Sequence, residues 1–270
     1  MIEPRECWAN GFERNDRPNA SLPLWRECFS GIEAAMLHFS PVYYGLEAEH
    51  GDGAAVVVLP GFLGGDVYLA ELWAWLYRLD YRPYFSGIRL NAECPNILIR
   101  RTLNATIDRA RRETGRKVHL IGHSLGGVIA LSAGVQRPDD IASIITLAAP
   151  FRGAVAHPNI LQIAELVRKS IKVRHGRKVL PNCYTGQCTC NFVNSLANVV
   201  PGRVQLTAVY TRTDSIVDWR YCVTGDPSID FEVPGTHLGL VFNSTAYTLI
   251  AKRLAAAERA LSSAATTIVQ

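Results

Sequence analysis

The stretch that decides the fold is KVHLIGHS at 117–124, followed by LGGVIALSAGVQ at 125–136. The first part is a short apolar run typical of a buried strand, and the second predicts a helix that a proline stops. At their junction Gly122, Ser124 and Gly126 form the pattern G-x-S-x-G. Between a strand and a helix this pattern indicates a sharp turn that lifts the serine hydroxyl out at the carboxyl edge of the sheet. Ser124 is therefore the first candidate for a nucleophile.

Strand-like and helix-like segments alternate on both sides of this turn. Further strands are expected at 54–60 (AAVVVLP), 81–88 (YRPYFSGI), 141–150 (IASIITLAAP), 204–210 (VQLTAVY) and 228–234 (SIDFEVP). Helices are expected at 69–79, at 98–114 and in a last segment that carries Tyr247, Ile250, Ala251, Leu254 and Leu261. Such alternation is the pattern of a mostly parallel sheet with helices on both faces. The sequence thus predicts an α/β fold with one main domain at 51–270.

Two segments break the alternation. Residues 151–202 contain the basic run RKSIKVRHGRK at 168–178 and a cysteine cluster, and they predict a cap inserted over the site. Residues 1–50 predict an extension, polar at 1–21, followed by an amphipathic helix. The apolar positions of this helix are Trp25, Cys28, Phe29, Ile32, Met36 and Phe39. We expect this apolar face to pack on the sheet, with contact to a membrane surface as the alternative.

Composition limits the function classes. With 48% hydrophobic and 19% charged residues among 270, the chain has enough apolar material for a large core. The net charge of +4 is modest and forms no concentrated basic stripe, so the sequence does not predict a nucleic-acid-binding surface. The basic run at 168–178 is expected to be a solvated face of a helix. No run approaches the roughly 18 apolar residues of a spanning helix, and no secretory signal is recognisable, which predicts a cytoplasmic protein.

The expected cytoplasmic location favours free cysteine thiols, whereas the clustering of three cysteines suggests a covalent link or a metal site. Cys183, Cys188 and Cys190 have the spacing C-x₄-C-x-C, which differs from the common zinc patterns. Because the cap has few apolar residues, we expect at least one disulfide within this group or to Cys222. A zinc site that includes His175 is the alternative. No metal or cofactor is expected in the chemistry itself.

Three stretches carry a resemblance to a known family. The extended turn GHSLGG at 122–127 resembles that of lipases and related carboxylesterases of the α/β-hydrolase superfamily. YTRTDSIV at 210–217 and GTHLGL at 235–240 are similar to the acid and histidine segments of small bacterial triacylglycerol lipases. In order of elements the resemblance covers roughly residues 54–262. It departs at Pro60, where lipases often have a histidine.

In this fold the carboxylic acid and then the histidine of a catalytic triad follow the serine. His157 and His175 lie in the predicted insertion, whereas His237 stands in a loop before the last helix, where the base is expected. Asp214 and Asp218 both follow the strand at 204–210. The resemblance implies Asp214 as the acid and Asp218 as a structural residue. The candidates Asp226 and Asp230 lie farther along the chain.

The remaining site residues surround the serine. An oxyanion hole needs two fixed donors, and the expected ones are the main-chain N–H groups of Leu125 and Phe62. The aromatic residues expected near the substrate are Phe62, Phe151, Tyr184 and Phe192.

The resemblance implies a serine carboxylesterase or lipase that acts through an acyl-enzyme on Ser124. A nonpolar small-molecule or lipid ester of short to medium chain is the expected substrate. An acyltransferase that uses the same triad is one alternative. A non-catalytic binding module on the same fold is another.

Overall fold

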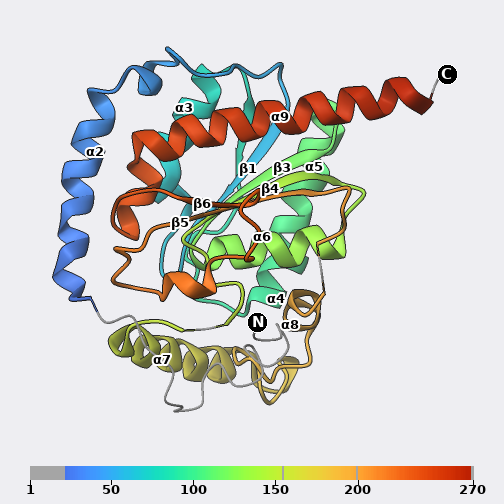
Figure 1. Cartoon of the computed structure of the whole chain (residues 1–270). Helices are drawn as coiled ribbons and strands as arrows, with labels where there is room; N and C mark the ends of the chain where they lie inside the picture. The colour runs from blue at the N-terminus through green and yellow to red at the C-terminus, as the bar shows by residue number, and fades with distance from the viewer. Residues whose placement is uncertain (1–21, 154, 199, 269–270) are drawn as a thin grey trace.

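The computed structural model describes residues 22–153, 155–198 and 200–268, and its six strands form one parallel sheet (Figure 1). The strand order is β2-β1-β3-β4-β5-β6. The strands are β1 (Ala55–Leu59), β2 (Arg82–Phe85), β3 (Val118–His123), β4 (Ile141–Leu147), β5 (Gln205–Tyr210) and β6 (Asp230–Glu232). The predicted parallel α/β architecture is confirmed. Because all strands run the same way, the segments after β3, β5 and β6 meet at one edge of the sheet.

Helices cover both faces of the sheet. One face is covered by α3 (Ala70–Arg78) and α9 (Ser244–Ile268), and the other by α5 (Asn104–Thr114) and α6 (Leu125–Gln136). Strand β1 shows why its sequence is continuously apolar: Val56 and Val58 pack toward α3 and α9, while Val57 and Leu59 pack toward α5 and α6. A strand buried on both faces has no polar side to present.

Shorter elements complete the chain. Helix α4 (Pro95–Leu98) continues through a π-helical turn (Ile99–Leu103) into α5. The 3₁₀ turns are η1 (Leu24–Phe29), η2 (Pro41–Tyr44), η3 (Asp66–Leu69), η5 (Gly176–Lys178), η6 (Trp219–Tyr221) and η7 (Leu238–Phe242). Within the described residues, no helix combines the length and apolar character needed to cross a membrane.

The segment at 151–202 that the sequence predicts as a cap, called the cap segment below, contains α7 (Pro158–His175) and α8 (Asn191–Leu196). Helix α8 is anchored to the main domain, since Ser195 Oγ lies 2.7 Å from Ser132 Oγ of α6. Helix α7 lies apart from the layers around the sheet (Figure 1). An isolated bridge between Ala156 and Val217 joins the start of the cap segment to the loop after β5. The cap segment is therefore held beside the carboxyl edge.

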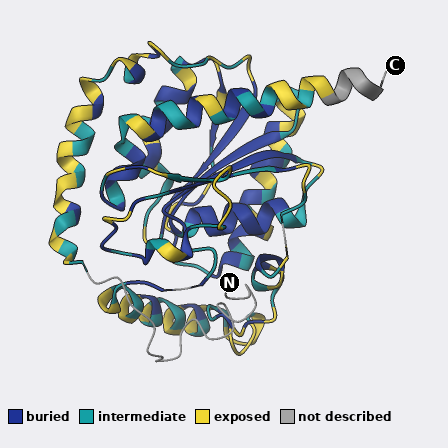
Figure 2. Cartoon of the chain, in the orientation of Figure 1, coloured by how far each residue is buried: buried dark blue, intermediate teal, exposed yellow. Residues whose placement is uncertain are grey.

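The N-terminal helix is turned the opposite way from the prediction. It consists of η1 followed by α2 (Ser30–His38), and the predicted extension at 1–21 lies outside the described residues. Trp25 and Phe39 are 62% and 88% exposed, whereas Glu27 is 7% exposed. Figure 2 shows the outer side of α2 as mostly exposed. The prediction that the apolar face packs on the sheet is wrong, because inward-facing carboxylates accept main-chain N–H groups there.

Candidate active site

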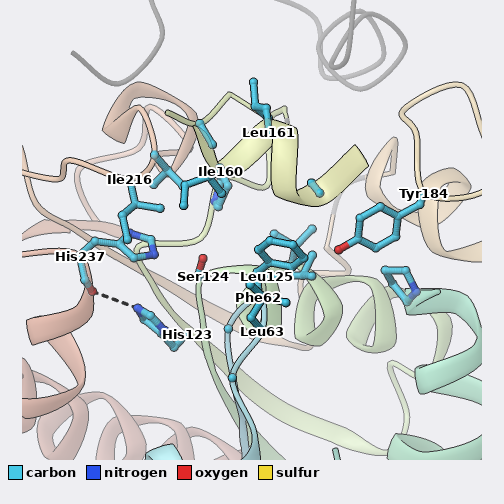
Figure 3. Close-up of a pocket in the computed structure, with 18 of the residues that line it drawn as sticks. Phe62, Leu63, His123, Ser124, Leu125, Ile160, Leu161, Tyr184, Ile216 and His237 are labelled. Carbon is cyan, nitrogen blue, oxygen red and sulfur yellow. Dashed lines mark hydrogen bonds between the residues drawn. The ribbon is translucent and has the colours of Figure 1, made fainter. Parts of the chain in front are cut away.

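Ser124 sits at the turn between β3 and α6, with φ 51° and ψ −124°. This strained conformation persists because the surroundings force it. A Cβ atom at Gly122 would overlap the main chain of Gly126, and one at Gly126 would overlap the carbonyl of Leu59. Both glycines are therefore required for the close approach of strand and helix. Ser124 Oγ consequently faces a cavity at the carboxyl edge (Figure 3).

The cavity has a volume of about 380 Å³ and an apolar wall. Its lining includes Phe62, Tyr184 and Phe192 from the predicted aromatic set, together with Ile160, Leu161, Ala164, Ile216 and Val217. Helix α7 supplies Ile160, Leu161 and Ala164, so the cap segment forms part of the wall. Phe151 does not line the cavity. It packs against the core on the α6 side of the sheet, so this cavity does not include it, unlike the other three predicted aromatic residues.

A buried carboxylate and imidazole lie beside Ser124. His237 Nδ1 is 2.7 Å from Asp214 Oδ2, and their side chains are 2% and 1% exposed. The other oxygen of Asp214 accepts the N–H groups of Ile216 and Val217, each at 2.8 Å. This fixes the carboxylate and leaves the second ring nitrogen of His237 for the cavity. Within the described residues, Ser124 and His237 share no direct hydrogen bond, and such bonds often tighten only when substrate binds.

Asp218, the other candidate acid, has no hydrogen bond or ion pair with His237 within the described residues. It accepts two hydrogen bonds from the guanidinium of Arg220, at 2.9 and 2.6 Å. Asp226 accepts hydrogen bonds from Ser228, and Asp230 accepts them from Thr224. The structure thus places only Asp214, of the four aspartates considered, against the histidine.

Opposing effects act on the pKa of His237. Burial disfavours the imidazolium and lowers the pKa, but the charge and hydrogen bond of Asp214 and the charge of Glu27 raise it. The net result is a pKa above the ordinary 6.5. The imidazolium form of His237 is therefore stabilised by two carboxylates, Asp214 and Glu27.

Two main-chain donors at Ser124 have no acceptor within the described residues. They are the N–H groups of Phe62 and of Leu125, the first residue of α6. Helix N-termini carry partial positive charge, so Leu125 is suited to an anion. The loop of Phe62 is held by Asn91, whose Nδ2 donates to Pro60 O at 2.8 Å. Asn91 O also accepts Leu63 N–H at 3.0 Å. The sequence offered no signal for Asn91.

Replacement of Asn91 by alanine is expected to lower both stability and turnover. The buried carbonyl of Pro60 would lose its donor, which costs about 1–3 kcal/mol, and the Phe62 loop would lose its fixed position. Thermal melting and kcat measure the two effects. Asn198→Ala, which removes an exposed bond to Asn194 O, is the control. An unchanged kcat in a destabilised Asn91→Ala protein would contradict the positioning role.

Two further residues hold the histidine loop. His123 Nε2 lies 3.0 Å from His237 O, and burial lowers the pKa of His123 to about 3. His123 is therefore neutral and donates from Nε2 to that carbonyl. Tyr68 OH donates to Leu238 O at 2.8 Å. His123 stands inside the G-x-S-x-G pattern, but the pattern alone gives no hint of this contact.

The cysteines differ from the prediction. All six described cysteines are free thiols. Cys183 packs with Cys94 in a small apolar cluster, and their hydrogen bond lowers the pKa of Cys94 to about 7. Cys222 is buried in a separate cluster, so the predicted link from the cap to Cys222 is wrong. His175 binds Glu93 at 2.9 Å, and the described residues contain no group of three or more metal-ligating side chains.

Comparison with solved structures agrees with this architecture. A metagenome-derived enzyme, from a study of the lipolytic enzymes LipS and LipT, superposes with a TM-score of 0.52 at 15% identity, over 78% of this chain and 96% of its own. The chain has the α/β-hydrolase fold. A monoacylglycerol lipase from Paleococcus ferrophilus matches this chain with a TM-score of 0.49 and 15% identity, over 78% of this chain and 97% of its own.

At the level of sequence, the model of the PGAP1-like alpha/beta domain matches residues 87–212 of this chain. That range includes Ser124 but ends before Asp214 and His237. No curated protein matches the sequence.

Proposed function

We propose that this α/β-hydrolase cleaves carboxylic esters through an acyl-enzyme on Ser124. The observation that carries the proposal is that Ser124 and His237 both line one apolar cavity, with Asp214 bound to His237 Nδ1 at 2.7 Å. The unpaired N–H groups of Phe62 and Leu125 lie at the same wall. A nucleophile, an oriented base and two fixed donors are the parts that acyl transfer requires.

The site residues have distinct roles in the proposed reaction, and His237 acts in turn as base and acid. His237 takes the proton of Ser124 as the hydroxyl attacks the ester carbonyl, and the N–H groups of Phe62 and Leu125 bind the resulting oxyanion. His237 then gives the proton to the departing alcohol. Water, deprotonated by His237, attacks the acyl carbonyl, and the bond to Ser124 Oγ breaks as His237 returns that proton to Oγ and the carboxylic acid leaves. Asp214 keeps the imidazole in the required tautomer throughout.

The cavity favours a nonpolar substrate. Among the described residues that line it, none is Lys, Arg, Asp or Glu. A charged acyl group would lose its water without gaining a partner, which is costly. The volume of about 380 Å³ suits a short to medium acyl chain. The lipolytic function of the superposed metagenome-derived enzyme supports an ester substrate of this kind.

An acyltransferase remains the second candidate, because an alcohol could replace water in the apolar cavity. Two experiments separate the possibilities. A fluorophosphonate probe should label wild-type protein at Ser124, and absence of labelling would favour a non-catalytic module. A panel of p-nitrophenyl esters from acetate to palmitate, run with and without an added alcohol, then distinguishes hydrolysis from transfer by its products.

Chain-length selection should depend on Ala164 of α7, which is buried and lines the cavity. Replacement of Ala164 by phenylalanine is expected to fill part of the cavity and lower kcat/KM for octanoate and longer esters by roughly 10- to 100-fold, with acetate little changed. The p-nitrophenyl panel measures this shift. Leu166→Phe, on the same helix but 64% exposed, is the control. Equal losses for acetate and octanoate would contradict the assignment of this wall to the acyl chain.

A further inference from the structure

A second buried carboxylate, besides Asp214, supports the candidate triad, and it comes from the N-terminal helix. Glu27 of η1 accepts the N–H of Leu238 at 2.8 Å, the N–H of His237 at 3.3 Å and the N–H of Ser215 at 3.4 Å. The hydroxyl of Ser215 also donates to it. All four partners are donors, so the side chain binds them as an ionised carboxylate.

Burial of the Glu27 carboxylate lowers the stability of the fold unless its charge is compensated. Glu27 is 7% exposed, and within the described residues it forms no ion pair with Lys, Arg or His. A buried carboxylate without a cation is expensive, although hydrogen bonds offset part of the cost. A neutral glutamine has one acceptor oxygen and could not accept at both Oε1 and Oε2, as Glu27 does. The carboxylate therefore satisfies donors of both loops and also places a negative charge near His237.

The contacts of Glu27 link two loops that are distant in sequence. Oε1 binds Ser215, the neighbour of Asp214, and also the main chain of His237. Oε2 binds Leu238 on the other side of the histidine. One side chain thus fixes the spacing between the acid loop and the histidine loop. The carboxylate also places its charge behind the imidazole.

We propose that Glu27 is a positioning residue for His237, one that locks the Asp214–His237 pair and stabilises the imidazolium form by its charge. This inference rests on the proposed function for its effect on catalysis, but not for its effect on His237. The groups that face His237 are Asp214 after β5, His123 of β3 and Glu27 of η1. Tyr68 of η3 reaches the next residue, Leu238.

Glu33 of α2 provides a matched comparison. It accepts the N–H of Thr236 at 3.0 Å and the hydroxyl of Thr236 at 2.6 Å, so it ties the same helix to the same loop. Its charge is not among the causes that shift the pKa of His237, whereas that of Glu27 is. Neutralising Glu33 should loosen the contact without changing the field at the imidazole.

The test uses the full chain with Glu27→Gln, Glu33→Gln and Glu27→Asp. NMR titration of the imidazole of His237 should give a pKa above 6.5 in wild-type protein, lower by about one unit in Glu27→Gln, and unchanged in Glu33→Gln. Since the base must be neutral to act, activity is lost as pH falls through this pKa. The acid limb of kcat/KM should therefore move to lower pH in Glu27→Gln only. Glu27→Asp keeps the charge and should return the acid limb of kcat/KM to its wild-type pH.

The outcomes separate the two proposals. An unchanged titration of His237 in folded Glu27→Gln, or equal shifts in Glu27→Gln and Glu33→Gln, would overturn the inference about Glu27. If Glu27→Gln does not fold, an imidazole in Glu27→Asp that titrates at or below 6.5 would overturn it as well. A wild-type protein that neither reacts with the fluorophosphonate nor cleaves esters, but shows the expected titrations, would overturn only the proposed function.

Discussion

Replacement of Ser124 by alanine is expected to abolish ester hydrolysis, with a fall in kcat of roughly 10⁶-fold, while the fold remains intact. The loss is large because no other hydroxyl can form the acyl-enzyme, whereas the methyl group of alanine fits the turn that the serine occupies. Hydrolysis of p-nitrophenyl butyrate and a thermal melting curve measure the two parts of this prediction. Fluorophosphonate labelling should disappear in the same variant.

Ser132→Ala is the control for this experiment. Ser132 is also a buried serine, on α6, and its hydroxyl bonds to Ser195 of α8. Its loss should lower the melting temperature by a few degrees and leave kcat within about threefold of wild type, because its contact is structural. Full activity in Ser124→Ala with an unchanged melting curve would refute the proposed mechanism.

The parts of the fold that the sequence predicted are those determined by local patterns. The apolar run at 117–124 became β3, and the glycines around Ser124 were required by close contacts with neighbouring backbone. A fully buried parallel strand and a strand-to-helix turn can be recognised from apolar runs and glycines because every residue in them packs against the core. His237 was predicted from its place after a strand and before the last helix, whereas Asp214 was preferred to Asp218 because of the resemblance to lipases. Their catalytic roles stay a prediction.

The errors came from contacts between distant segments. Periodicity showed that the helix after Leu24 has a polar and an apolar face, but it could not show which face turns inward. Burial of Glu27 depends on N–H groups more than 180 positions away in sequence, at Ser215 and His237. The same limit applies to Asn91 and to the pairing of Cys183 with Cys94. No local pattern in the chain specifies such partners.

The identity of the acid determines the second large effect. Replacement of Asp214 by asparagine is expected to lower kcat by about 10⁴-fold, as loss of the orienting carboxylate does in serine proteases. The N–H groups of Ile216 and Val217 would hold the amide oxygen, which leaves the NH₂ group facing Nδ1 of His237. An NH₂ donor there forces the imidazole proton onto Nε2. The ring then cannot accept the proton of Ser124.

Asp218→Asn is the matched control, since Asp218 is equally buried and lies on the same loop. Its carboxylate binds Arg220, so the variant should lose some stability and less than about tenfold in kcat. The two variants are compared by kcat at a pH well above the pKa of His237, where the wild-type base is neutral. A strong loss in Asp218→Asn with a mild one in Asp214→Asn would reassign the acid to Asp218. Because Asp218 has no contact with His237 among the described residues, that result would also require the loop after β5 to rearrange when substrate binds.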